Sequence, residues 1–147
     1  DVGTGSGILA IAAVALGARR AAAFDVDVGA ALLAGQHVRL NGMSARVCCW
    51  AGDVRALRKG VRFDVVCANA LPHELEREQK QIVQATRLGG SLLVSGMTIE
   101  EREEVVASWV RRDRKLRPSP SLELLEDGWA ARVLTREPED ESDLDNP

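Results

Sequence analysis

The first seven residues of the chain, DVGTGSG, place a glycine at every second position from residue 3 to residue 7. The loop pattern that binds a dinucleotide, GxGxxG, would need a glycine where this sequence has Ile8. A pyrophosphate also needs backbone amides that open toward it at a helix N-terminus. Gly3, Gly5 and Gly7 instead let bare backbone approach a ligand closely. Taken singly, these glycines also fit an ordinary tight turn between a strand and a helix, so both interpretations stay open.

A nucleoside ligand without phosphate fits this loop, and S-adenosylmethionine (SAM) is of that kind. Its sugar and its methionine portion need a close backbone without side chains, which the three glycines provide. Thr4 and Ser6 add hydroxyl groups that can hydrogen-bond the amino-acid end of such a ligand. The loop therefore favours SAM over a dinucleotide.

Asp25 is the second candidate, because it ends the apolar run from Ala21 to Phe24 and follows the glycine loop in the chain. A carboxylate at that place can accept two hydrogen bonds from a ribose diol. Enzymes that bind NAD have the same spacing, so Asp25 indicates a nucleoside without saying which. The alternative is an acid that starts the next helix, although Asp27 is the better candidate for that cap.

Two further polar residues follow strand-like runs. Asp53 comes after the run 46–50, and its carboxylate could accept from an exocyclic adenine amine. The alternative is an ordinary turn aspartate. Asn69 closes the run 63–68, and its amide could hold an incoming amine or the amino-acid end of the cofactor. The alternative for Asn69 is a helix cap.

The rest of the chain must position these residues, and it alternates between two periodicities. Segments with apolar residues at helical spacing are separated by short apolar or β-branched runs that end at turn residues. The predicted helices cover residues 7–16, 28–40, 72–87 and 99–112, and the predicted strands cover residues 21–24, 46–50, 63–68, 91–95, 122–125 and 129–134.

This alternation predicts an α/β fold with a mostly parallel, twisted sheet, helices on both faces and a C-terminal antiparallel hairpin. Ligands of such sheets bind beyond the carboxyl ends of the strands, so we expect one ligand to contact all the residues found there. The candidate cofactor-binding residues are Asp1, Gly3, Thr4, Gly5, Gly7, Asp25, Asp53 and Asn69.

The composition is that of one globular domain. The chain has 147 residues, of which 46% are hydrophobic and 28% charged, and a net charge of −3. It has no apolar run long enough to cross a bilayer and no basic field that would indicate a nucleic-acid partner. We expect a catalytic domain over residues 1–136. Residues 137–147 include six acidic residues and two prolines and are predicted to be a disordered tail.

The cysteines and tryptophans have simple structural interpretations. Cys48, Cys49 and Cys67 lie in apolar runs without a CxxC pair, so we expect buried free thiols, a reducing cytoplasmic compartment and no metal site. Trp109 and Trp129 are interpreted as packing residues and not as a substrate cage.

Six segments share a family pattern: DVGTGSGILAIAAVALGA, FDVD, LNG, FDVVCANAL, LGGSLLVSG and DGWAARVLTRE. Together they resemble the PrmA-type family of ribosomal protein (L-eleven) lysine methyltransferases, within the class I SAM-dependent methyltransferase superfamily. The resemblance runs from Asp1 to about Glu137. It implies a Rossmann-like class I fold with seven strands, the last one reversed, and cofactor contacts at Gly3, Asp25 and Asn69.

The activity that this resemblance implies is N-methylation of a protein amine, with a ribosomal protein lysine as the expected target. The cofactor supplies the activated methyl group, so the protein mainly aligns the reacting atoms. Asn69 is the catalytic candidate because it could orient the amine. His73 could act as a base, and its alternative is a surface histidine at a helix start.

Three features depart from the family pattern. The family has a substrate-recognising N-terminal domain and a threonine-bearing loop ahead of the glycine motif, and the sequence contains neither. We therefore expect a fragment that lacks most of its first strand. Pro72-His73 also stands where the family usually has small residues after its Asn-x-Leu motif. Two alternatives stay open: a methyltransferase for another protein, a nucleic acid or a small molecule, and a non-catalytic remnant.

Overall fold

The computed structural model describes residues 1–138, and the chain divides into two units that we describe separately. The first unit comprises residues 1–59 and 67–69, and the second comprises residues 60–66 and the chain from residue 70 on. The predicted tail, 137–147, lies outside the described residues from residue 139 on.

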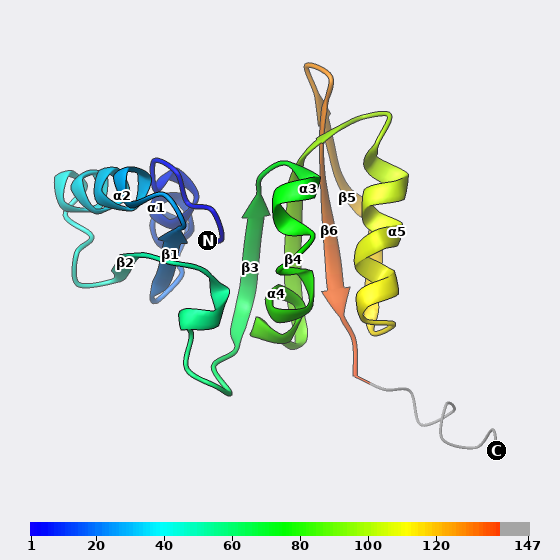
Figure 1. Ribbon diagram of the computed structural model, residues 1–147, viewed down its shortest axis with the longest axis horizontal. Coiled ribbons are helices and arrows are strands. Elements are labelled where there is room, and N and C mark those ends of the chain that lie inside the picture. Colours follow the sequence, from blue (N-terminus) through cyan, green and yellow to red (C-terminus); the bar gives the residue numbers. More distant parts are fainter. Residues whose placement is uncertain (139–147) are drawn as a thin grey trace. The chain divides into compact units, whose positions relative to one another are not determined.

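The first unit is a parallel α/β arrangement. Its elements are α1 (Ile8–Ala15), β1 (Ala21–Asp25), α2 (Val28–Leu40), β2 (Val47–Ala51) and a 3-10 helix (Val54–Ala56). Strands β1 and β2 pair in parallel, from Ala21 opposite Val47 to Asp25 opposite Ala51. Figure 1 shows α1 and α2 beside these two strands, in blue and cyan. The predicted helices 7–16 and 28–40 and strands 21–24 and 46–50 are confirmed to within one residue at each end.

Local sequence explains the bounds of α2. The Asp27 carboxylate accepts from the backbone N–H of Gly29 at 2.7 Å, which is the predicted N-cap. His37 and Arg39 lie in its last turn, where positive or polar groups complement the helix dipole. Alanines let both helices pack closely on the strands. The buried core of this unit contains Ala10, Val14, Ala23, Val38 and Val47.

The second unit holds a four-stranded sheet in the order β3-β4-β6-β5. Strand β3 (Phe63–Asn69) is divided between the units: residues 63–66 belong to the second unit and its last three residues to the first. Strand β4 (Thr86–Thr98) pairs antiparallel with β6 (Trp129–Arg136), which pairs antiparallel with β5 (Leu116–Glu126). The predicted C-terminal hairpin is therefore confirmed. Because β5 is an edge strand, it tolerates the two prolines at positions 118 and 120.

Helix α5 (Arg102–Arg112) packs against this sheet through Trp109, which is 1% exposed. Arg132 of β6 joins Glu103 of α5 at 3.4 Å and Glu123 of β5 at 2.9 Å. Trp109 is thus a packing residue, as predicted.

The predicted helix over residues 72–87 is wrong in its extent. The structure has a short α3 (Pro72–Leu75), a turn, and α4 (Gln79–Ala85), after which β4 begins at Thr86. Residues 76–81 are all polar, so no apolar side chain lies one turn beyond Leu75. The side-chain amide of the buried Gln79 donates to the Ser108 hydroxyl and accepts from Arg112 Nε, each at 3.0 Å, and these hydrogen bonds connect α4 to α5.

The cysteine prediction is partly wrong. All three thiols are free, but Cys48 is exposed, and Cys49 and Cys67 are half-buried. Alternate residues of a strand point to opposite faces, so Cys48 and Cys49 differ in burial although they are neighbours in β2. Burial raises the pKa of the Cys67 thiol, which keeps that sulfur protonated at neutral pH. Among residues 1–138, no helix has both the length and the apolar character needed to span a membrane.

Candidate functional site

Three chain segments of the first unit meet side by side at one edge. Val2 forms parallel bridges with Phe24 of β1 on one side and with Ala68 of β3 on the other. Its N–H donates to the Cys67 carbonyl at 2.9 Å, and the Thr4 N–H donates to the Phe24 carbonyl at 2.9 Å. The three residues that follow this rung are Gly3, Asp25 and Asn69.

Strand β2 brings the fourth candidate to the same edge. Asp25 lies opposite Ala51 in the parallel register, and the Gly52 N–H donates to the Asp25 carbonyl at 2.8 Å. Asp53 follows directly. The structure therefore brings the predicted residues from all four segments to the carboxyl ends of parallel strands, where ligands of such sheets bind. Their contact with a ligand stays a prediction.

The glycine loop owes its course to backbone angles that glycine adopts readily. Gly3, Gly5 and Gly7 have φ values of 64°, 53° and 83°. A Cβ built on Gly5 would have no heavy atom within 4 Å, so this backbone faces open space. A Cβ on Gly7 would lie 3.1 Å from the Cα and Cβ of Ala34 in α2. The loop thus presents bare backbone on one side and packs tightly against α2 on the other.

Asp1 supports the loop from within. Its Oδ2 accepts from the Thr4 hydroxyl at 2.5 Å and from the Ala10 backbone N–H at 3.1 Å. Thr4 is 5% exposed, so its hydroxyl serves mainly the loop. The Asp1 carboxylate also occupies a first-turn amide of α1, which an anionic ligand group would otherwise use.

Asp25 joins the loop to the end of β1. Its Oδ2 accepts from the Gly5 N–H at 2.9 Å, and its Oδ1 accepts from the Asp27 N–H at 3.0 Å. Since a carboxylate offers about four lone-pair sites, two remain for a ligand. Asp27 caps α2, so the alternative that Asp25 is the helix-start acid is wrong.

Asp53 caps the 3-10 helix that follows β2. Its Oδ1 accepts from the Arg55 N–H at 2.8 Å, and its Oδ2 accepts from Nε of the same arginine at 2.9 Å and from Nη2. Hydrogen bonds from the Arg55 side chain hold the pKa of Asp53 below its usual value. The turn interpretation of Asp53 is therefore correct, and a role in binding adenine is a separate prediction.

Asn69 is exposed at the end of β3. The N-cap of α3 is Leu71, whose N–H donates to the Glu74 Oε2 at 3.0 Å, so the helix-cap interpretation of Asn69 is wrong. His73 is exposed in α3. The Asn69 amide is thus available to a ligand.

One residue at this site escaped the sequence analysis. His37 Nδ1, in the last turn of α2, lies 2.7 Å from the Ser6 carbonyl oxygen of the glycine loop. The two residues are 31 positions apart, and no motif links them. The one available signal is that His37 follows Ala34 by three residues, on the same face of α2.

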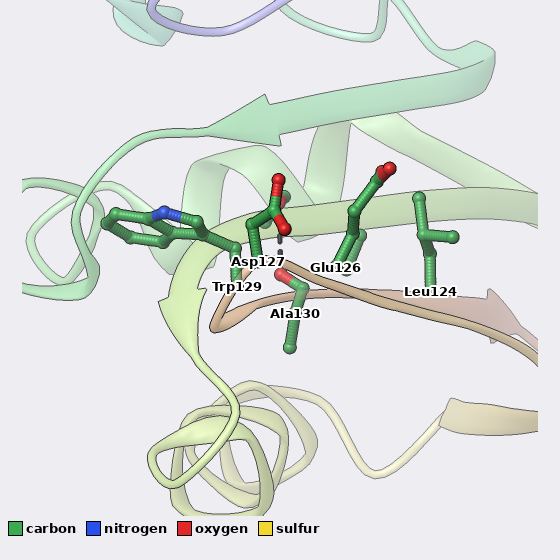
Figure 2. Close-up of a pocket in the computed structure, with 7 residues that line it drawn as sticks. Leu124, Glu126, Asp127, Trp129 and Ala130 are labelled. Atoms are coloured by element: carbon green, nitrogen blue, oxygen red, sulfur yellow. Dashed lines mark hydrogen bonds between the residues drawn. The ribbon is translucent and has the colours of Figure 1, made fainter.

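The second unit contains a shallow pocket of about 270 Å³ on the β5–β6 hairpin. Figure 2 shows Leu124, Glu126, Asp127 and Trp129 around it. The Ser95 hydroxyl donates to the Ala130 carbonyl at 3.0 Å. Trp129 is 51% exposed, so its interpretation as a packing residue is wrong. It lies beside the hairpin turn, at the start of β6.

Within residues 1–138, no three His, Cys, Asp or Glu side chains are arranged to hold a metal ion. The carboxylates at the first unit's edge are instead engaged by backbone N–H groups, a hydroxyl and one arginine.

Comparison with known proteins identifies a family. The family model described as "Ribosomal protein L11 methyltransferase (PrmA)" matches residues 1–136. A ribosomal protein L11 methyltransferase of Pelobacter propionicus is 38% identical over 136 residues, covering 92% of this chain and 42% of the relative. Its counterpart from Geobacter sulfurreducens is 43% identical over 111 residues, covering 76% of this chain and 36% of the relative. The chain thus spans about two fifths of the length of these relatives.

Solved structures share the architecture. A ribosomal protein L11 methylase from Lactobacillus delbrueckii subsp. bulgaricus has a TM-score of 0.82 at 25% identity and covers 94% of this chain and 69% of the neighbour. A methyltransferase from Pyrococcus furiosus has a TM-score of 0.74 at 13% identity, over 93% of this chain and 73% of the neighbour. The predicted class I, Rossmann-like methyltransferase fold is confirmed.

Proposed function

Because this chain belongs to the ribosomal protein L11 methyltransferase (PrmA) family, we propose that the protein is a SAM-dependent methyltransferase that methylates amines of a ribosomal protein. The target that the family description favours is L11, with lysine as the expected residue type. The cytoplasm is the compartment where such a substrate is made, and we propose it as the location. The observation that carries this proposal is the glycine loop at 3–7 hydrogen-bonded to Asp25 at one edge of a parallel sheet.

The residues at this edge suit SAM better than a dinucleotide. SAM has a net positive charge, from a sulfonium and an ammonium group against one carboxylate, and the edge carries the carboxylates of Asp1, Asp25 and Asp53. A pyrophosphate would be repelled by these acids, and Asp1 already accepts from an amide at the start of α1. The open space beside Gly5 supports the close approach of a bulky ligand.

Each residue has an expected task. Asp25 would accept from the ribose hydroxyls with its two free lone-pair sites, and Asp53 would accept from the adenine amine. Gly3 and Gly5 would lie against the sugar and methionine portions. SAM supplies an activated methyl group, so the protein has little covalent chemistry to perform. Asn69 would orient the incoming neutral amine, which gains rate by alignment.

The proposal is tested with the intact protein, SAM labelled in its methyl group, and purified L11 as substrate. We expect label in L11, and a clearly lower rate of labelling when Asp25→Ala replaces the wild-type enzyme at SAM concentrations near the wild-type KM. Bulk ribosomal RNA and an unrelated lysine-rich protein serve as alternative substrates.

The outcomes separate the competing functions. Label in another protein or in RNA, with none in L11, would retain the methyltransferase and reject the substrate. Calorimetry with S-adenosylhomocysteine decides the remaining case, since absence of binding would identify a non-catalytic remnant.

A further inference from the structure

We propose that His37 is a positioning residue for SAM binding, which holds the Ser6–Gly7 peptide in the one orientation that leaves the glycine loop open to the cofactor. This inference rests on the proposed function, since it concerns the same loop. It assigns a role to a side chain on α2 that is neither part of the loop nor among the predicted ligand contacts.

The contact between His37 and the loop is specific. Nδ1 lies 2.7 Å from the Ser6 carbonyl oxygen, so Nδ1 carries the proton and donates it to that oxygen. The N–H of the same peptide, on Gly7, donates to the Thr4 carbonyl at 2.8 Å. One peptide plane is therefore fixed at both its oxygen and its nitrogen.

This peptide needs such a restraint because of its neighbours. Gly5 and Gly7 flank Ser6, with φ values of 53° and 83°. Glycine reaches many other backbone conformations at little cost, so the loop alone does not select this one. Only the Gly5–Ser6 peptide separates this plane from the Gly5 N–H, which donates to Asp25 at 2.9 Å, so the restraint lies directly beside that contact. His37 thus stabilises the conformation in which loop and carboxylate meet.

Helix α2 provides a rigid base for His37. Asp27 caps its first turn, and Ala34 and Val38, on either side of His37 along the helix, are buried at 0% and 3% exposure. Ala34 is also the residue that a side chain on Gly7 would strike. Helix α2 therefore contacts the loop at two positions about one turn apart, by packing through Ala34 and by a hydrogen bond through His37. Affinity gained by fixing a binding loop beforehand is the expected consequence.

A pair of isosteric substitutions isolates the hydrogen bond. In His37→Asn the side-chain amide nitrogen takes the place of Nδ1 and still carries an N–H. Leucine has nearly the same shape as asparagine, but His37→Leu places a methyl group there. We expect His37→Leu to raise the SAM Kd and KM by about five- to tenfold, the effect of one lost hydrogen bond. His37→Asn should stay within about twofold of wild type by the same reasoning.

The measurements are calorimetry with SAM, the KM for SAM and kcat of the intact protein, and the thermal unfolding midpoint. Because His37 touches no reacting atom, kcat should be unchanged in both variants. Gln36→Ala, at an exposed neighbour on α2, controls for substitutions in this helix. A loss confined to affinity in His37→Leu, restored in His37→Asn, supports the proposal.

Each of the following results would overturn it. Equal SAM affinity in the Asn and Leu variants would show that the donor is not needed. A fall in kcat with unchanged affinity would assign His37 a different role. Wild-type protein that binds no SAM would reject the proposed function together with this inference, whereas wild-type binding with an unaffected Leu variant would reject the inference alone. If His37→Leu does not fold while His37→Asn does, the contact is structural and the positioning role is rejected.

Discussion

At the scale of single residues, the acids of the first unit have two roles, as predicted ligand contacts and as hydrogen-bond acceptors for the loop. Asp1 and Asp25 were predicted as ligand contacts, and in the structure they also accept hydrogen bonds from Thr4 and Gly5 of the glycine loop. Loop and carboxylates therefore form one connected network. Removing a member should affect affinity through both the lost ligand contact and the released loop.

Asp25 and Asp27 offer a matched test of this network. We expect Asp25→Ala to weaken binding of S-adenosylhomocysteine by at least about tenfold, because both the Gly5 contact and the ligand contact are lost. Asp27→Ala removes the α2 cap and should cost about 1 kcal/mol of stability with binding nearly unchanged. Titration calorimetry and chemical denaturation of both variants provide the two readings. Similar losses of affinity in the two would argue against a specific role for Asp25.

Asn69 should separate binding from turnover. It is exposed at the end of β3 and caps no helix, so its amide is free to orient a substrate amine. We expect Asn69→Ala to lower kcat by about tenfold or more while the SAM Kd changes much less, since an orienting group acts in the transition state. Steady-state methyl transfer and calorimetry on the same preparation make the comparison. Unchanged turnover would remove Asn69 from the mechanism.

At the scale of elements, burial decides what the tryptophans do. Trp109 lies on the inner face of α5 and is 1% exposed, whereas Trp129 begins β6 and is 51% exposed beside the hairpin turn. The two have the same side chain and opposite surroundings. Their sequence neighbourhoods did not distinguish them.

The two tryptophans should therefore differ in their contribution to stability. We expect Trp109→Ala to cost about 3–5 kcal/mol of unfolding free energy, the usual range for emptying a packed aromatic position. Trp129→Ala should cost less than about 1 kcal/mol, since half of the side chain is already in contact with water. Urea denaturation monitored by circular dichroism measures both values. A large loss for Trp129→Ala would indicate that the hairpin depends on this indole.

At the scale of the whole molecule, the chain builds two units with different contents. All eight candidate cofactor-binding residues belong to the first unit, and the Trp129 pocket belongs to the second. A ligand that binds at the first unit's sheet edge should stabilise that unit first.

Hydrogen exchange can detect this difference. With S-adenosylhomocysteine in excess over its Kd, we expect slower exchange of the amides at residues 3–7 and around Asp25 and Asp53. Exchange in the hairpin strands β5 and β6 should change least, because the candidate site contains none of their residues. Mass spectrometry of exchanged peptides gives the comparison. Protection confined to the hairpin would relocate the binding site.

The sequence alone determined the features that depend on short-range chemistry. The alternating glycines of the loop, the Asp27 cap of α2 and the strand that ends at Asp25 are recognisable because a few neighbouring residues dictate each of them. The order of strands and helices followed from periodicity, and with it the edge at which Gly3, Asp25, Asp53 and Asn69 lie together.

Only the tertiary structure decided the features that depend on distant partners. The contact of His37 with Ser6 and the exposure of Cys48 and Trp129 have no fixed signature along the chain. Each depends on which surfaces are covered after packing, and burial is a property of the folded chain and not of a local run of residues.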